Sequence, residues 1–294
     1  PKGAEQEAEG ETTSGSEALN NIQFEMKPEE LEAYLNEYVI KQDEAKAILA
    51  TKVCTHFNRI KHELQNEKTQ DPTVVGRIKN NIIMIGPTGV GKTYMVKLIA
   101  NKLGVPFVKG DATKFSETGY VGGDVEDLVR DLVNEANDNI ELAQYGIVYI
   151  DEIDKIASSQ NLIGPDGSRT GVRRALLKPM EETDVDMKVP HDPISQIQAI
   201  EQYRKTGKRE KQVINTRNIL FIMSGAFTAL AEIIRKRVKK QGIGFGADLS
   251  SKAEEEQFLK MVKAEDLIQY GFESEFVGRL PVVSVFEELA ADDL

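Results

Sequence analysis

The chain has 294 residues, of which 40% are hydrophobic, enough to form a buried core. Its 37 lysines and arginines against 48 acidic residues give a formal net charge of −11, which disfavours bulk association with nucleic acid or anionic membranes. The single cysteine and three scattered histidines exclude a disulfide framework and show no zinc-site spacing. With no apolar run of about 18 to 20 residues and no signal segment, we expect a soluble, cytoplasmic protein that does not enter a membrane.

The N-terminal part divides into a polar leader and two helices. Residues 1–21 are rich in Glu, Gly, Ser and Thr and offer little to bury, which predicts a disordered leader. Pro28 suits the first turn of a helix, so a short helix is expected at 28–37. Apolar residues at helical spacing between 45 and 64 predict a long amphipathic helix.

Short apolar runs alternate with helical stretches through the rest of the chain. This alternation predicts an α/β fold, a parallel sheet flanked by helices in three layers (αβα). The predicted strands are 82–85, 105–108, 146–150 and 219–223, and the predicted helices are 92–103, 125–142 and 172–180.

A glycine-rich loop, GPTGVGKT, follows the first predicted strand. Its glycines let successive amides point at phosphate oxygens at the start of a helix, Lys92 would reach the β and γ phosphates, and the Thr93 hydroxyl would bind Mg²⁺. The loop predicts a site for ATP and Mg²⁺. Its expected nucleotide-binding residues are Gly86, Pro87, Thr88, Gly89, Val90, Gly91, Lys92, Thr93 and Tyr94.

A second motif, IVYIDEID at 147–154, is an apolar strand that ends in acids. Asp151 would hold Mg²⁺ through water, and Glu152 would act as the general base on the attacking water. Alone, such a strand end could simply face solvent. The two motifs in this order predict nucleotide hydrolysis, with Lys92 and Glu152 as catalytic residues.

A third motif, FVGRLPV at 276–282, places Arg279 in a short turn. The arginine is either a surface charge that pairs with a carboxylate, or an arginine finger that stabilises transition-state charge in a neighbouring subunit. Spacing alone leaves both alternatives open.

Taken together, these segments resemble the AAA+ family and, within it, the ClpX protein unfoldases, from about residue 28 to the end. The resemblance is carried by YVIKQDEAK (38–46), the glycine-rich loop, VPFVKGDATKFSETGYVGGDVEDLV (105–129), GIVYIDEIDKI (146–156), GIGFGA (242–247) and EDLIQYGFESEFVGRLPVV (265–283). It implies that 22–289 form the large AAA+ ATPase domain. It also implies that Val39 and Ile40 contact adenine and that Arg279 is a catalytic arginine finger.

The resemblance further implies a homo-hexamer that unfolds protein substrates. Tyr120 and Val121 match the pore loop that grips a translocating polypeptide, and an aromatic–aliphatic pair beside glycines suits contact without sequence readout. Ile243, Gly244 and Phe245 match the tripeptide that docks on the ClpP peptidase, which the sister unfoldase HslU lacks. Unfolded or tagged proteins and a ClpP-like peptidase are therefore the expected partners.

The chain departs from the family pattern at several places. Lys41 and Gly123 stand where Gly and Glu are usual. Residues 290–294 are expected to begin the hinge to a small helical domain, so we expect that domain to be absent from this chain.

Three alternatives remain: an HslU-like unfoldase, a nucleic-acid remodelling AAA+ ATPase, and an ATP-binding regulator that unfolds nothing. The negative net charge disfavours nucleic-acid binding, which would depend on one basic cluster, formed by Lys205, Lys208, Arg209 and Lys211.

Overall fold

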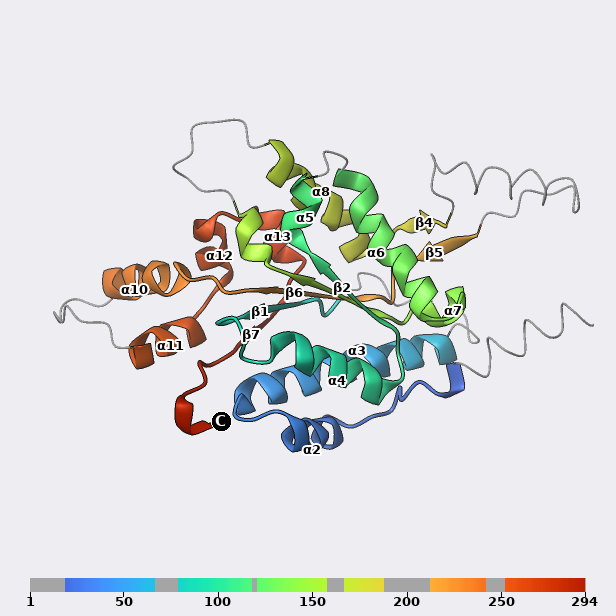
Figure 1. Ribbon diagram of the computed structural model, residues 1–294, viewed down its shortest axis with the longest axis horizontal. Helices are drawn as coiled ribbons and strands as arrows, with labels where there is room; N and C mark the ends of the chain where they lie inside the picture. Colours follow the sequence, from blue (N-terminus) through green and yellow to red (C-terminus); the bar gives the residue numbers. More distant parts are fainter. Residues whose placement is uncertain are drawn as a thin grey trace, which may run out of the picture.

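A parallel β-sheet forms the centre of the computed structural model, which describes residues 19–66, 79–117, 121–157, 167–187, 212–241 and 252–293. Within these residues the sheet has five strands in the order β2-β3-β6-β1-β7 (Figure 1). The strands are β1 (Ile82–Ile85), β2 (Phe107–Asp111), β3 (Ile147–Asp151), β6 (Leu220–Gly225) and β7 (Val282–Val285).

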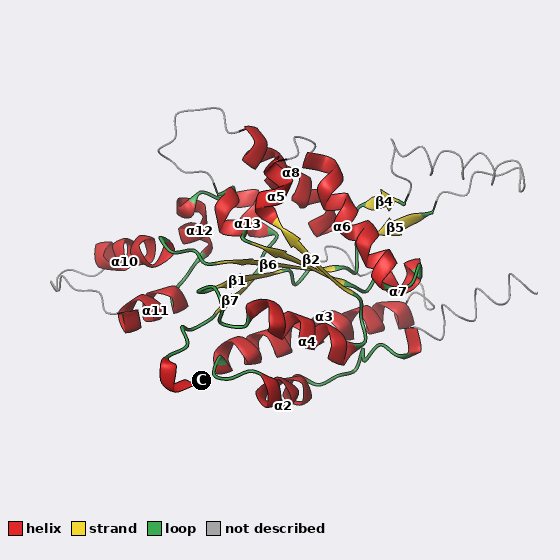
Figure 2. Ribbon diagram, viewed as in Figure 1, coloured by secondary structure: helices red, strands yellow, loops and turns green. Residues whose placement is uncertain are grey.

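Helices cover both faces of the sheet, which gives three layers (Figure 2). One face packs against α2 (Pro28–Tyr38), α3 (Asp43–Asn66) and α4 (Lys92–Leu103). The other packs against α5 (Ala112–Glu117), α6 (Val121–Glu135), α8 (Gly167–Glu181), α10 (Leu230–Gln241), α12 (Ala264–Tyr270) and α13 (Ser274–Gly278). Shorter elements are α7 (Ile140–Ala143), α11 (Lys252–Lys260) and the 3₁₀ turns η1 (Ile153–Ile156) and η2 (Ala291–Asp293).

The apolar run of β1 explains the layering. Ile82 and Met84 belong to the core on the side of α2, α3 and α4, whereas Ile83 and Ile85 belong to the core on the opposite side. All four side chains are buried, as expected for a strand covered on both faces. The predicted three-layer α/β fold is therefore confirmed.

The second predicted strand, 105–108, begins two residues too early. The helix before it ends at Gly104, whose φ of +74° closes the helix, and the Val105 N–H still donates to Ala100 O at 3.1 Å. Residues 105 and 106 therefore complete the helix ending, and β2 runs from 107 to 111.

The predicted helix 125–142 is wrong as a single element. Asn137 and Asp138 have φ angles of +53° and +61°, which no α-helix contains, so α6 ends at 135. The Asn139 side chain then caps the new helix α7 by accepting from Leu142 N at 2.9 Å.

Strand β7 and a hairpin have no counterpart among the predicted elements. The hairpin pairs β4 (Asp184–Asp186) with β5 (Val213–Asn215) in antiparallel fashion. The basic cluster falls on 188–211, outside the described residues.

The predicted leader overlaps the folded part at its end. Residues 1–18 lie outside the described residues, but Leu19 packs against the core, and the Ile22 N–H donates to Leu19 O at 3.2 Å. Gln23 N donates to Leu103 O at 3.0 Å, which ties this segment to α4. Of the described helices, none combines the length and apolar character that crossing a membrane requires.

Candidate functional site

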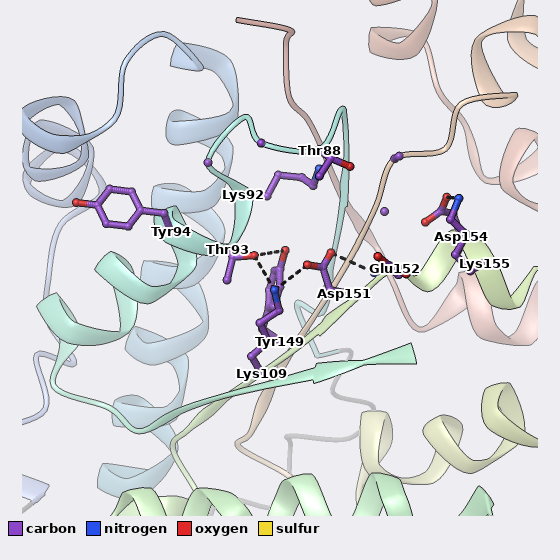
Figure 3. A pocket seen from close by; sticks show the side chains of 14 residues that line it. Thr88, Lys92, Thr93, Tyr94, Lys109, Tyr149, Asp151, Glu152, Asp154 and Lys155 are labelled. Atoms are coloured by element: carbon purple, nitrogen blue, oxygen red, sulfur yellow. Dashed lines mark hydrogen bonds and ion pairs between the residues drawn. The ribbon is translucent and has the colours of Figure 1, made fainter. Parts of the chain in front are cut away.

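The strand order brings the predicted motifs together at one edge of the sheet. The carboxyl ends of β3, β6 and β1 are neighbours, so Asp151, Ser224 and the glycine-rich loop meet there. The Gly86 N–H donates to Gly225 O at 3.1 Å, which joins the loop to β6. A pocket of about 420 Å³ opens between them and is lined by residues from all three strand ends (Figure 3).

The glycine-rich loop is curled as a phosphate cradle requires. Gly89 and Gly91 have φ angles of +87° and +92°, a region that side chains disfavour. The Lys92 Nζ donates to Gly86 O at 2.6 Å and to Pro87 O at 2.5 Å. Burial lowers the pKa of Lys92, and Asp151 opposes this effect.

Other predicted loop residues surround this cradle. The first turn of α4 carries no acidic residue, so its amide groups are available to an anion. Thr88 lines the pocket, and Val90 is buried in the core. Tyr94 lines the rim of the pocket and is half exposed. The loop therefore fits a polyphosphate.

The two predicted magnesium ligands lie close together. The Lys109 Nζ is 2.9 Å from Asp151 Oδ2 and 3.5 Å from Thr93 Oγ1, so one atom reaches both side chains (Figure 3). The Thr93 hydroxyl also donates to the Tyr149 hydroxyl at 3.1 Å. Burial raises the pKa of Tyr149 to about 12, so this phenol stays neutral.

The carboxyl group of Asp151 is held in its charged form. Burial by itself raises its pKa, but the hydrogen bond and charge of Lys109, together with hydrogen bonds from the Glu152 N–H and Ser224, keep the pKa below its ordinary value. No cluster of three His, Cys, Asp or Glu side chains suited to a metal occurs in the described part of the chain. One carboxylate and one hydroxyl fit Mg²⁺, which in nucleotide sites takes its remaining ligands from phosphate and water.

Glu152 has an unusual backbone conformation. Its φ and ψ of 57° and 31° are left-handed, which is costly for a residue other than glycine and is concentrated at functional sites. Its N–H donates to Asp151 Oδ1 at 3.1 Å, and its side chain is exposed at the pocket wall. The conformation leaves the carboxylate accessible from the pocket, where a general base is required.

Two further residues complete the site and were not assigned roles from sequence. Ser224 is fully buried in β6, and its Oγ donates to Asp151 Oδ1 at 3.1 Å. Lys109 comes from β2, where register pairs it with Tyr149. Lys109 lies inside the segment 105–129 that carries the family resemblance, and Ser224 directly follows the predicted strand 219–223, but only strand order and register bring both to the site.

Arg279 lies at the amino ends of the strands, opposite the carboxyl ends that form the pocket. The Asn81 Nδ2, just before β1, donates to Arg279 O at 3.2 Å, whereas the glycine-rich loop follows β1. The four-residue strand is about 13 Å long, so Arg279 is remote from its own pocket. Its guanidinium pairs with Glu181 and lies 3.9 Å from Glu275.

The predicted adenine contacts lie between α2 and α3. Val39 is buried and Ile40 is 54% exposed, and neither lines the pocket as described. Lys41 follows with a φ of +58°, a conformation that favours glycine. Its ammonium donates to Glu288 O at 3.2 Å and pairs with Asp293 at 3.5 Å, so it ties this loop to the last described segment.

Several predicted residues cannot be placed. Tyr120 lies outside the described residues, as do Ile243, Gly244 and Phe245. Val121 is the first residue of α6, but its side chain is outside the described part. Gly123 lies in the first turn of the same helix. The pore and docking assignments therefore stay predictions.

Comparison with known proteins agrees with the motifs. Residues 77–283 match the family described as "AAA domain (Cdc48 subfamily)". The chain is 40% identical over 271 residues to "ATP-dependent Clp protease ATP-binding subunit ClpX" of Treponema denticola, covering 91% of this chain and 61% of that protein. It is also 40% identical over 269 residues to proteins of the same name from Borrelia duttonii and Borrelia recurrentis, covering 91% of this chain and 59% of each.

The chain thus spans about three fifths of the length of these relatives. The family match covers both nucleotide motifs and the described sheet as far as Val283 in β7. The chain belongs to the AAA domain family, and within the matched residues its sequence is similar to these ClpX proteins.

Proposed function

We propose that this chain is the ATP-hydrolysing domain of a protein unfoldase. The complete protein would form a homo-hexamer and thread protein substrates through its central pore to a ClpP-like peptidase. The observation that carries the proposal is the single pocket in which the glycine-rich loop, Asp151 and Glu152 meet. The similarity to ATP-binding subunits of Clp proteases supports this proposal.

Each residue of the pocket has a distinct role in the proposed hydrolysis. The loop amides and Lys92 bind the phosphates and fix the γ-phosphate. Thr93 and Asp151 would hold Mg²⁺, which when bound neutralises charge on the phosphate oxygens. Ser224 orients the Asp151 carboxylate through its hydrogen bond. Glu152 orients a water molecule and accepts its proton as the water oxygen bonds to the γ-phosphorus and the bond from phosphorus to the bridging oxygen breaks, which releases ADP.

Arg279 would complete the pocket of a neighbouring subunit. Its place beside the amino end of β1, remote from its own pocket, supports a role across a subunit interface. There its charge would stabilise the transition state of phosphoryl transfer, so hydrolysis would depend on assembly. The pairing with Glu181 would hold the guanidinium until an interface forms.

The chain path offers a mechanical connection from the pocket to the predicted pore loop. Strand β3 ends in Asp151 and pairs with β2, and β2 runs directly into α5. Val121 is the first residue of the next helix, α6, which packs against β2 and α8, and Tyr120 directly precedes it in the sequence. A change at Asp151 can therefore reach the pore loop through two paired strands.

The test uses the full-length protein that contains this chain, with a tagged fluorescent protein as substrate. We expect ATP-dependent loss of fluorescence, no loss with Glu152→Gln, and ATP hydrolysis without unfolding in Tyr120→Ala. Unfolding that persists in Glu152→Gln would contradict the catalytic assignment. Normal unfolding by Tyr120→Ala would contradict the pore assignment.

A further inference from the structure

The side chain of Lys109 occupies an unexpected place in the pocket. Its Nζ lies 2.9 Å from Asp151 Oδ2 and 3.5 Å from Thr93 Oγ1, the two groups assigned to magnesium (Figure 3). The ammonium thus contacts both proposed magnesium ligands at once. No other described lysine or arginine is recorded in an ion pair with Asp151.

Strand register explains how Lys109 reaches this place. Lys109 and Asp111 of β2 pair with Tyr149 and Asp151 of β3, so all four side chains leave the sheet on the same face. That face is covered by α4, whose first turn carries Thr93. The Lys109 stem passes Tyr149, with Nζ 5.8 Å from the centre of its ring, and ends between Thr93 and Asp151.

The pair has little value as a structural contact. The side chains of Lys109 and Asp151 are 46% and 26% exposed, and ion pairs of that exposure stabilise a fold only weakly. The carboxylate, by contrast, has two other hydrogen-bond donors, Ser224 Oγ and Glu152 N, that orient it without Lys109. The position of the ammonium therefore points to an effect on what binds the carboxylate.

We propose that the Lys109 ammonium is an internal cation that occupies the magnesium position and that Mg²⁺ must displace. The inference rests on the proposed function, because it assigns Mg²⁺ to Thr93 and Asp151. Its consequence is that nucleotide binding with Mg²⁺ releases a side chain of β2, the strand that leads into α5. Binding of nucleotide and Mg²⁺ in the pocket would thereby change the contacts of the segment that precedes the predicted pore loop.

The test compares the affinity of the 294-residue chain for a fluorescent ADP analogue in excess Mg²⁺ and in EDTA. By linkage, the ratio of the two affinities is the factor by which the protein strengthens or weakens Mg²⁺ binding to the nucleotide. Lys109→Met keeps the length of the side chain and removes the charge. Because the competing cation is gone, we expect this ratio to rise about threefold to tenfold.

A matched control removes a different positive charge from the same pocket. Lys155 lines the pocket but pairs with Asp154 at 3.5 Å and has no recorded contact with Thr93 or Asp151. We expect Lys155→Met to change the ratio by less than about twofold, since only the general charge of the pocket changes. Thermal melting of both variants checks that each is folded.

The outcomes separate the inference from the proposed function. A ratio that rises in Lys109→Met and not in Lys155→Met supports the inference. An unchanged or lower ratio in Lys109→Met overturns it while nucleotide binding stands. Equal rises in both variants also overturn it, because the effect is then one of net charge. No binding of the analogue at millimolar concentration overturns both the inference and the function.

Discussion

The buried histidine of α3 makes the stability of the fold depend on pH. His56 is fully buried and its Nε2 contacts Asn218 O at 3.0 Å, whereas its Nδ1 finds no hydrogen-bond partner among the described residues. The edge of its ring lies against Phe57, with ring centroids 5.1 Å apart. A second proton would therefore create a buried N–H without an acceptor. Burial lowers the pKa of His56 from 6.5 to about 3.

The sign of the effect follows from linkage. Because the folded pKa is lower than the unfolded one, unfolded chains bind the proton first as the pH falls. The stability is complete above pH 6.5 and is lost progressively as the pH falls from 6.5 towards 3. Between about pH 7.5 and about pH 5, the His56 contribution to the free energy of unfolding falls by about 2 kcal/mol.

Urea unfolding at these two pH values, with wild type and His56→Gln, measures the effect. Glutamine keeps a donor for Asn218 O but does not titrate, so the wild type is expected to lose about 2 kcal/mol more than the variant. Burial lowers the pKa of Lys79 to about 7, so this lysine titrates within the same window, but it does so in both proteins and its contribution cancels in the comparison. Equal losses in the two proteins would refute the reasoning, whatever the stability of the variant at pH 7.5.

Two further predictions concern the site. Ser224→Ala removes the hydroxyl that donates to Asp151 Oδ1, so we expect about a tenfold lower hydrolysis rate with unchanged nucleotide affinity in EDTA, measured by phosphate release and fluorescence titration. An unchanged rate would show that Ser224 does not orient the carboxylate. Arg279→Ala and Glu152→Gln are each expected to inactivate the full-length protein, but mixed hexamers should regain hydrolysis, because some interfaces combine an intact Glu152 with an intact Arg279. Mixtures as inactive as either variant would contradict a role of Arg279 in trans.

The parts of the fold set by local chemistry were predictable from sequence. The predicted bounds 82–85 and 92–103 agree with β1 and α4. Asn81 and Gly86 flank the apolar run of β1, and Gly91 and Gly104 flank α4. The break at Asn137 was not predictable, because apolar spacing continues across it while the backbone turns. Strand β7 was not predicted, because it is short and its first residue overlaps the FVGRLPV motif. Its pairing with β1 is a tertiary contact that the local sequence does not reveal.

The candidate site likewise contains residues that the local sequence identifies and residues that only the tertiary structure identifies. Lys92, Thr93, Asp151 and Glu152 stand in contiguous motifs, so their chemistry could be inferred from spacing. Lys109 has no such signal, because it reaches the pocket only through the register of β2 against β3. Ser224 likewise becomes a partner of Asp151 only because β6 lies between β1 and β3.

The departure at Lys41 also acquires a physical explanation. The φ of +58° accounts for the glycine that the resemblance leads one to expect at this position. A lysine there is strained, but its ammonium contacts Glu288 O and Asp293, which offsets part of that cost. The loop that carries Val39 and Ile40 is thereby joined to the last described segment of the chain.

The central claim is that this pocket binds and hydrolyses ATP with Glu152 as the general base. The most direct measurement is phosphate release by full-length wild type and Glu152→Gln, together with the affinity of each for a fluorescent ATP analogue. We predict similar affinities and a rate at least about a hundredfold lower in the variant, because the loop and Lys92 are intact while the base is lost. Equal rates at equal affinity would contradict it.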